Sequence, residues 1–169
     1  MTSPVLSELA ASVGALLKET KQTVAVSESS AGGLISAALL AVPGASAYFL
    51  GGGVVYTQAA RRAILRVDDE AVKGIRSSTE AYAQVKARAI QGLLGTTWGV
   101  GETGATGPTG NRYGDAAGHV CIAVAGPVAR VITLETGSSD REANMWTFTR
   151  AALELFEACV REARAARRP

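Results

Sequence analysis

The segment that most restricts the fold is a short run at residues 23–27, TVAVS, which is mostly apolar and rich in β-branched residues. A run of this kind is typical of a strand that is buried on both faces of a sheet. It is followed by the glycines Gly32 and Gly33 and then by the apolar, helix-like composition of residues 34–40. A strand, a loop and a helix in this order form the unit from which parallel α/β sheets are built. The sequence therefore predicts an α/β fold.

The other segments continue this alternation. A helix is predicted before the first strand, because Ser3 and Pro4 resemble an N-cap followed by a first helical residue, and apolar residues then recur at helical spacing to Thr20. Further helices are predicted at 58–65, 79–94 and 139–165, and further strands at 51–56, 98–103, 119–125 and 129–134. The last two strands meet at Gly126 and Pro127, so we expect them to form a hairpin.

Length and composition limit the class of protein. A chain of 169 residues without an evident linker is the size of one domain, which we place at residues 1–169. Apolar residues make up 47% and charged residues only 19%, which excludes a disordered chain and allows a partly apolar surface. The net charge of +2 is too small to indicate a nucleic-acid partner.

The sequence also predicts neither a secretion signal nor a membrane span. The N-terminus lacks a basic start and an uninterrupted apolar run, and the most apolar stretch, 34–50, is divided at Pro43 and Gly44. We therefore predict a cytoplasmic protein with no membrane partner. Cys121 and Cys159 are not at metal-binding spacing, and we expect buried, reduced thiols. A metal site made of carboxylates alone is disfavoured, so we predict no metal and no cofactor.

Three clusters of polar and glycine residues follow predicted strands. The first is SESSAGG at 27–33 and the second is GGGVVYTQAAR at 51–61. The third begins with Glu102, Thr103 and Gly104 and continues as a glycine-rich loop to Gly118, which matches neither a P-loop nor a dinucleotide fingerprint. Ligands of open α/β sheets bind outside the carboxyl ends of the strands, where these clusters would meet if the strands run parallel. We predict one site there.

The first two clusters can support nucleophilic chemistry. Ser29 and Ser30 precede a helix whose free N–H groups could hold a phosphate, or the oxyanion formed when a serine attacks an amide. The alternative is that the serines only cap this helix. Tyr56 and Arg61 would bring a phenol and a cation to the same edge, where they could help to remove a proton from the serine. The alternative for Tyr56 is a packing role.

Taken together and in this order, the clusters resemble the family of CinA C-terminal domains, which includes nicotinamide mononucleotide deamidases. The family motifs AESCTGG, PGSS and GGxVxY(S/A)NExK correspond here to SESSAGG at 27–33, PGAS at 43–46 and GGGVVYTQAAR at 51–61. Its (T/S)GIAGPxGG and GDR motifs correspond to TGATGPTGN at 103–111 and SDR at 139–141. The resemblance covers nearly the whole chain.

The resemblance implies a three-layer α/β/α sandwich with a mixed, mostly parallel sheet, and a homodimer. It also implies an amidohydrolase without metal or cofactor, which converts nicotinamide mononucleotide to nicotinic acid mononucleotide and ammonia. The nucleophile of the family falls on Ser29, its assisting tyrosine on Tyr56 and its catalytic lysine on Arg61. The residues expected to bind the nucleotide are Glu28, Ser30, Gly32, Gly33, Glu102, Thr103, Gly104, Gly107 and Gly110.

The sequence departs from the family at positions that matter for catalysis. Arg61 can hold a charge but cannot accept a proton as a neutral lysine can. The four lysines, Lys18, Lys21, Lys73 and Lys86, fall in no motif, so we look for the base at Tyr56 or Glu102. Asp115 stands where the family has a lysine.

These departures leave alternatives open. One is a nucleotide-binding module of the same fold that is non-catalytic or acts on another substrate. Another is a partner protein in DNA uptake or repair, which follows from the family name and finds no support in the near-neutral charge.

Overall fold

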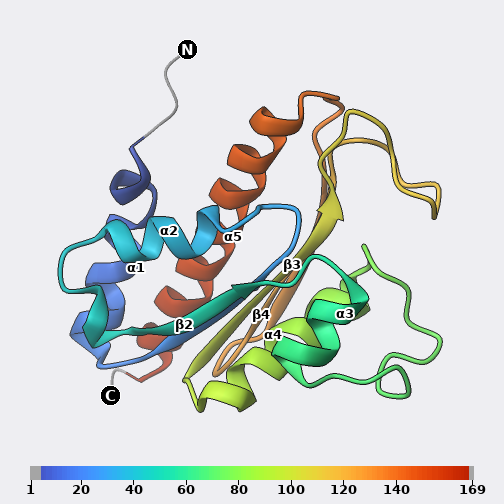
Figure 1. The fold of residues 1–169 in the computed structure, drawn as a ribbon. Helices are drawn as coiled ribbons and strands as arrows, with labels where there is room; N and C mark the ends of the chain where they lie inside the picture. The colour runs from blue at the N-terminus through green and yellow to red at the C-terminus, as the bar shows by residue number, and fades with distance from the viewer. Residues whose placement is uncertain (1–4, 168–169) are drawn as a thin grey trace.

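A five-stranded sheet forms the centre of the structure, a computed structural model that describes residues 5–167 (Figure 1). The strands are β1 (Val24–Glu28), β2 (Phe49–Val54), β3 (Trp98–Ala105), β4 (His119–Ala125) and β5 (Arg130–Glu135), in the spatial order β2-β1-β3-β4-β5. β1 pairs in parallel with β2 and β3, whereas β4 is antiparallel to β3 and β5. Four strands therefore run in one direction and β4 in the other, which confirms the predicted mixed, mostly parallel sheet.

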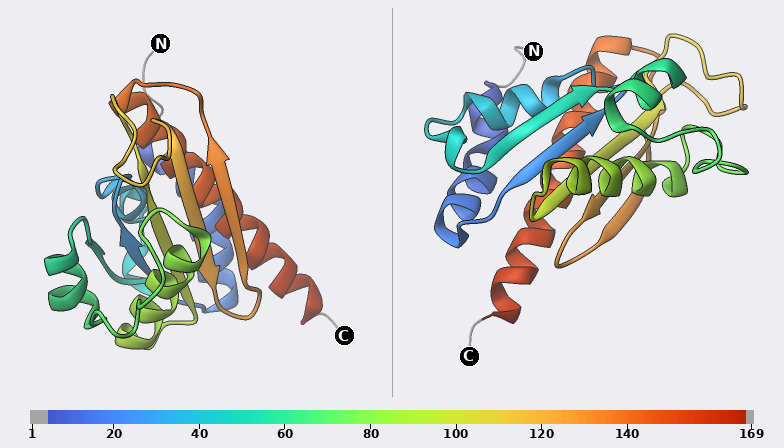
Figure 2. Two further views of the ribbon diagram at one scale, coloured as in Figure 1. Left: turned by 90° about the vertical axis from the view of Figure 1, so that its right-hand side faces the viewer. Right: turned by 60° about the horizontal axis from the view of Figure 1, so that its bottom comes forward.

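Helices cover both faces of the sheet, as Figure 2 shows. One face carries α1 (Leu6–Thr20), α2 (Leu34–Ala41) and α5 (Arg141–Ala166), and the other carries α4 (Glu80–Leu94). Two short turns, α3 (Gln58–Ala60) and η2 (Arg61–Leu65), follow β2, and a third, η1 (Ala45–Ala47), precedes it. The predicted three-layer α/β/α architecture is confirmed.

The two faces of the sheet carry side chains of different size, because neighbouring residues of a strand point to opposite faces. In β4, Val120, Ile122 and Val124 pack against α1, α2 and α5, while Cys121 and Ala123 face α4. In β3, Gly99 and Gly101 face α4 so closely that a Cβ at either position would collide with the helix backbone. Small residues thus let α4 lie directly on the sheet, which matters for the site below.

The predicted elements agree with the structure except around residues 58–65. The helix predicted there is a single α-helical turn capped by Thr57, whose hydroxyl accepts from the N–H of Ala60, followed by a π-helical turn that ends at the left-handed Arg66. The β4–β5 hairpin is confirmed, and Cys121 and Cys159 are free and buried as predicted. The N-cap predicted at Ser3 and Pro4 lies outside the described residues. No described helix is long and apolar enough to cross a membrane.

Candidate active site

The carboxyl ends of β1, β2 and β3 open on a cavity of about 550 Å³. Its wall includes four predicted site residues: Ser29 follows β1, Tyr56 lies just beyond β2, and Thr103 and Gly104 belong to β3. The structure therefore brings the three sequence clusters to one edge of the sheet. Polar side chains complete the wall, among them Gln58, Ser77, Ser78, Tyr82, Asn111, Arg112 and Tyr113.

Two smaller cavities adjoin this one. A cavity of about 270 Å³ shares Tyr56, Gly104 and Asn111 with it and is lined by the glycine-rich loop, including Gly107 and Gly110, together with Ser30 and Arg141. A cavity of about 320 Å³ shares Gln58, Ser77, Tyr82 and Tyr113 with the first and contains Arg61. Ser29 and Arg61 therefore border different cavities.

Glu28 lies beneath the site and lines none of these cavities. Its side chain is fully buried, and its carboxylate accepts hydrogen bonds from the N–H groups of Gly33, Ile35 and Ser36 at 2.8–3.0 Å. Burial raises the pKa of Glu28 above its ordinary value. Glu28 thus caps the N-terminus of α2, and this placement differs from the expected contact with substrate.

Glu102 occupies the other side of the same junction and is also fully buried. Its carboxylate accepts from the N–H of Ser29 at 2.8 Å, from the N–H of Ala31 at 2.9 Å and from the hydroxyl of Ser30. These bonds make Glu102 a fixed part of the loop that carries Ser29. Its carboxylate does not face the cavity, so the structure does not support Glu102 as the base.

The two carboxylates change what this helix N-terminus can bind. Within residues 29–36 every backbone N–H except that of Ser30 donates to Glu28, to Glu102 or to a backbone carbonyl. The N–H of Ser30 has no acceptor among the described residues. The sequence predicts several free donors here for a phosphate or an oxyanion, and the structure leaves one. Gly32 and Gly33 have positive φ angles of 69° and 100° and serve the turn into α2 instead of a cavity wall.

Tyr56 stands at the boundary of two cavities and is 61% exposed. Its hydroxyl accepts from Arg141 Nη2 at 3.3 Å, and Arg141 Nη1 donates to the carbonyl of Gly107 at 2.6 Å. Arg61 is instead buried in an ion pair with Asp69, a residue of the loop that follows its π-helical turn. The cation beside Tyr56 is therefore Arg141, and the expected pairing of Tyr56 with Arg61 is wrong.

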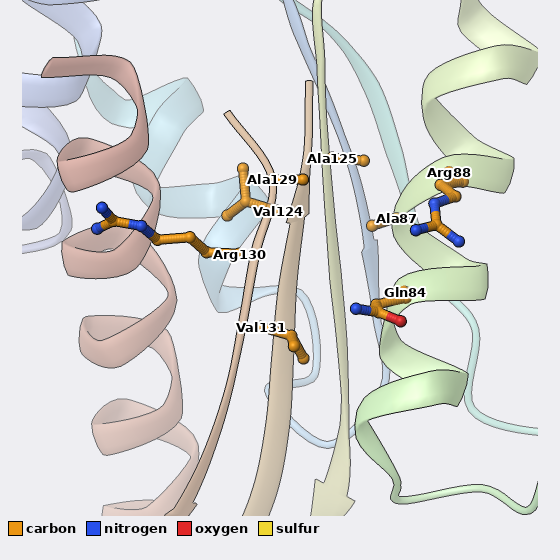
Figure 3. A pocket seen from close by; sticks show the side chains of 8 residues that line it. All are labelled: Gln84, Ala87, Arg88, Val124, Ala125, Ala129, Arg130 and Val131. Carbon is orange, nitrogen blue, oxygen red and sulfur yellow. The ribbon is translucent and has the colours of Figure 1, made fainter. Parts of the chain in front are cut away.

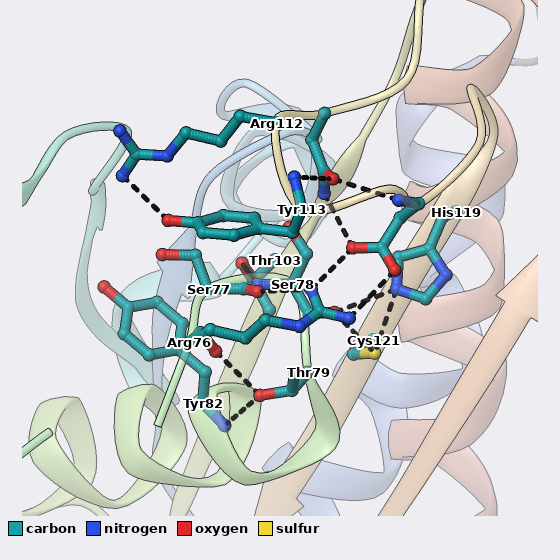
Figure 4. Close-up of polar contacts among 12 residues, drawn as sticks. Arg76, Ser77, Ser78, Thr79, Tyr82, Thr103, Arg112, Tyr113, His119 and Cys121 are labelled. Atoms are coloured by element: carbon teal, nitrogen blue, oxygen red, sulfur yellow. Dashed lines mark hydrogen bonds and ion pairs between the residues drawn. The ribbon is translucent and has the colours of Figure 1, made fainter. Parts of the chain in front are cut away.

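The glycine-rich loop is held in place by the charge of Asp115. Arg76, which Figure 4 shows among the polar side chains of this region, donates to both oxygens of this carboxylate at 2.7 and 3.0 Å. Arg76 thereby lowers the pKa of Asp115 to about 2. Asn111 also donates to Asp115, at 2.7 Å. On the same side, the hydroxyl of Thr103 accepts from the N–H of Ser78 at 3.2 Å. Asp115 therefore positions the loop, and its charge is compensated within the protein.

Lys86 of α4 is a residue of this site that the motifs missed. Its ammonium group is fully buried and donates to the carbonyls of Glu28, Val55 and Glu102 at 3.2, 3.4 and 2.7 Å. Burial lowers its pKa to about 8. Its spacing from Ala83, Ala87 and Ile90 is the helical spacing of the inner face of α4. This periodicity is the signal in the sequence that could have identified Lys86, which belongs to none of the family motifs.

A further cavity lies away from these residues. It has a volume of about 130 Å³ and lies between α4 and the β4–β5 hairpin (Figure 3). Its lining comprises Gln84, Ala87, Arg88, Val124, Ala125, Ala129, Arg130 and Val131, none of which is a predicted site residue. Within residues 5–167, no three His, Cys, Asp or Glu side chains are grouped as metal ligands.

Sequence comparisons relate almost the whole chain to one family. The profile of the CinA C-terminal domain matches residues 6–160. A CinA-like protein from Synechocystis is 36% identical over 138 residues, which are 82% of this chain and 33% of that protein. A CinA-like protein from Salinibacter ruber is 37% identical over 146 residues, 86% of this chain and 35% of that protein. The chain thus spans about a third of the length of these relatives.

Solved structures match the chain over nearly its full length. A CinA superfamily protein from Klebsiella pneumoniae has a TM-score of 0.86 and 25% identity, with 94% of this chain and 99% of that chain covered. A competence/damage-inducible protein from Agrobacterium tumefaciens has a TM-score of 0.83 and 27% identity, with 94% and 98% covered.

Proposed function

This chain belongs to the family of CinA C-terminal domains, and from that premise we propose that it is an amidohydrolase acting on the carboxamide of nicotinamide mononucleotide or a related pyridine nucleotide. The observation that carries the proposal is the cavity of about 550 Å³ bordered by Ser29, Tyr56 and Thr103. Its size is in the range of small-molecule sites. Ser29 is half-buried there, with its hydroxyl on a turn that Glu102 holds in place.

The adjoining cavity of the glycine-rich loop suits the phosphate of such a nucleotide. Within residues 5–167, Arg141 donates to a carbonyl and a phenol but forms no ion pair with a carboxylate. In the same described range, the N–H groups of Gly107, Thr109 and Gly110 have no acceptor in the protein. A guanidinium and free backbone donors are the groups that bind phosphate. The charged end of the substrate would lie there, with the carboxamide toward Ser29.

The reaction then requires one nucleophile and one proton relay. Ser29 Oγ attacks the carboxamide carbon, the tetrahedral intermediate expels ammonia, and water hydrolyses the resulting ester to the acid. In this proposal Tyr56 passes the serine proton to the leaving nitrogen. This role is supported by the bond from Arg141, which the Tyr56 hydroxyl accepts, so that the hydroxyl keeps its own proton free to donate. The N–H of Ser30 is the available donor for the oxyanion.

The test is ammonia release from nicotinamide mononucleotide by the wild type, Ser29→Ala and Ser30→Ala. We expect Ser29→Ala to lower turnover by on the order of 1000-fold or more, as for other serine nucleophiles. Ser30→Ala is the matched control, because it removes a neighbouring hydroxyl that is bound to Glu102. Activity that survives in Ser29→Ala removes this residue from the mechanism, and loss in Ser30→Ala alone transfers the role to Ser30.

A second candidate function is a nucleotide-binding module without turnover. It is favoured by Arg61, which stands at the position of the family lysine and is held by Asp69 away from the cavity of Ser29. Calorimetry with nicotinamide mononucleotide separates the two functions: binding without ammonia release supports the module, and turnover excludes it. Arg61→Lys adds a second comparison. A large gain in the rate of ammonia release would show that catalytic activity was lost through the arginine at this position.

A further inference from the structure

Lys86 links three neighbouring strand segments through a single atom, its Nζ. An ammonium group has three N–H donors, and those of Lys86 reach three carbonyls at 2.7–3.4 Å. The acceptors come from the end of β1, from the residue after β2 and from the middle of β3. α4 can deliver the side chain there because Gly99 and Gly101 let this helix lie against β3.

Each of these carbonyls belongs to the residue directly before a residue of the cavity wall. The bonds to the carbonyls of Glu28, Val55 and Glu102 each fix one peptide unit. These three peptide units lead into Ser29, Tyr56 and Thr103, which line the cavity. Lys86 itself borders none of the cavities described. Lys86 therefore contacts the backbone that carries the site residues and not the cavity in which a substrate would lie.

The peptide unit between Glu28 and Ser29 is held from both sides. Its carbonyl accepts from Lys86 at 3.2 Å and from the N–H of Val55 at 2.7 Å, while its N–H donates to the Glu102 carboxylate at 2.8 Å. Buried charges at both ends leave this peptide little freedom to rotate. Stability alone does not account for the lysine, since a well-packed apolar side chain of similar volume often serves a buried position as well or better.

We infer that Lys86 is a positioning residue, which sets Ser29, Tyr56 and Thr103 relative to one another by holding the three preceding carbonyls. This role rests on the proposed function in so far as it concerns turnover. The rigidity that Lys86 gives to the three strand ends can be tested without any substrate.

The first test compares Lys86→Met with Lys73→Met. Methionine keeps the length and volume of the side chain and removes the donors. Lys73 is a matched control because its exposed side chain pairs, within residues 5–167, only with Glu70. We expect Lys86→Met to lower kcat by on the order of 100-fold with KM little changed, because small misplacements of reacting groups cost about that much. Lys73→Met should behave as wild type. Unchanged kcat in folded Lys86→Met overturns the inference.

The second test uses hydrogen exchange and does not depend on turnover. In Lys86→Met the amides of Ser29, Tyr56 and Thr103 should exchange faster than in wild type, with unaltered exchange in α1 and α5. Unaltered exchange at all three amides contradicts the positioning role of Lys86. This outcome can be read even if the wild type releases no ammonia and the proposed function fails. Should Lys86→Met not fold, Lys86→Gln retains two donors and should give a smaller effect in the same direction, whereas wild-type kcat and exchange in that variant count against the role.

Discussion

Lys86 is buried as an ammonium group whose ordinary pKa is 10.5 and whose pKa here is lowered to about 8 by burial. Between these two values the unfolded chain binds a proton that the folded chain has released, so folding becomes more favourable as the pH rises. We expect wild type to gain stability relative to Lys86→Met from about pH 8 to pH 10.5. Thermal unfolding of both proteins across this range measures the difference. A constant difference would mean that Lys86 is not shifted.

Asp115 makes a prediction of the same sign in acid, because its pKa is also lowered on folding. Its pKa is lowered from 3.8 to about 2 by Arg76, so its contribution to stability is present above about pH 4 and is lost as the pH falls toward 2. Asp115→Asn should therefore melt at a lower temperature than wild type at neutral pH and approach it in acid. Arg76→Gln removes the same interaction from the other side, so the double variant should lose little more than either single one.

At the scale of the element, the packing of α4 on β3 depends on two glycines. A Cβ at Gly101 would meet the backbone of Ala83 and Ala87, which lie about one turn before Lys86 and directly after it. We expect Gly101→Ala to destabilise the protein by about 1–3 kcal/mol, the usual cost of overpacking, and to lower kcat because α4 must shift.

A second glycine of the same region serves as the control. Gly92 lies in α4 with open space around its Cα, so Gly92→Ala should stabilise the protein by about 0.5–1 kcal/mol through helix propensity. Denaturant titration of both variants checks the opposite signs. Equal effects would show that α4 does not rest on β3 at Gly101.

Most elements could be predicted because their patterns are local. The buried strand β1 and the hairpin of β4 and β5 follow from composition and turn residues, and the structure confirms them within a residue or two. The π-helical turn at Arg61–Leu65 has no such pattern. Arg61 is the first residue of this turn, and the structure pairs its side chain with Asp69, whereas the sequence predicts it beside Tyr56.

The site could be located from the sequence, but its internal bonds could not. Ser29, Tyr56 and Thr103 follow strands, so topology alone brings them to one edge. The bonds of Glu102 to Ser29 and of Lys86 to Glu28 join residues 73 and 58 positions apart. Such contacts depend on how α4 and the strands pack on one another, and no local sequence pattern predicts them.

At the scale of the whole molecule, the two edge strands, β2 and β5, differ in how well they are protected against pairing with another chain. β5 carries charged residues that form ion pairs, Arg130 with Glu162 and Glu135 with His119. β2 has no charged residue between Phe49 and Val54, and Leu50 and Val54 are 46% and 45% exposed. An uncharged, apolar edge strand is prone to pair with another chain. We therefore expect the homodimer implied by the sequence to form along β2.

Leu50→Lys tests this expectation by light scattering at micromolar concentration. A charge on the edge strand should convert a dimer to a monomer, because a buried, unpaired ammonium opposes association. Val5→Lys is the control, since Val5 is also apolar and exposed but lies before α1. A monomeric wild type, or a dimer that survives Leu50→Lys, contradicts association through β2.

The central position of β3 has a consequence for synthesis on the ribosome. β1 emerges early, yet its second neighbour in the sheet is β3 (Trp98–Ala105), and the side chains that bond to the peptide between Glu28 and Ser29 are Lys86 and Glu102. Much of the nascent chain must therefore be made before the site can assemble. Until then the backbone carbonyl of Glu28 lacks its bond from Lys86, and the apolar side chains of β1 lack the neighbouring strand β3. Premature termination before residue 102 should therefore yield a product with neither a stable sheet nor a formed pocket, which cellular proteases would remove.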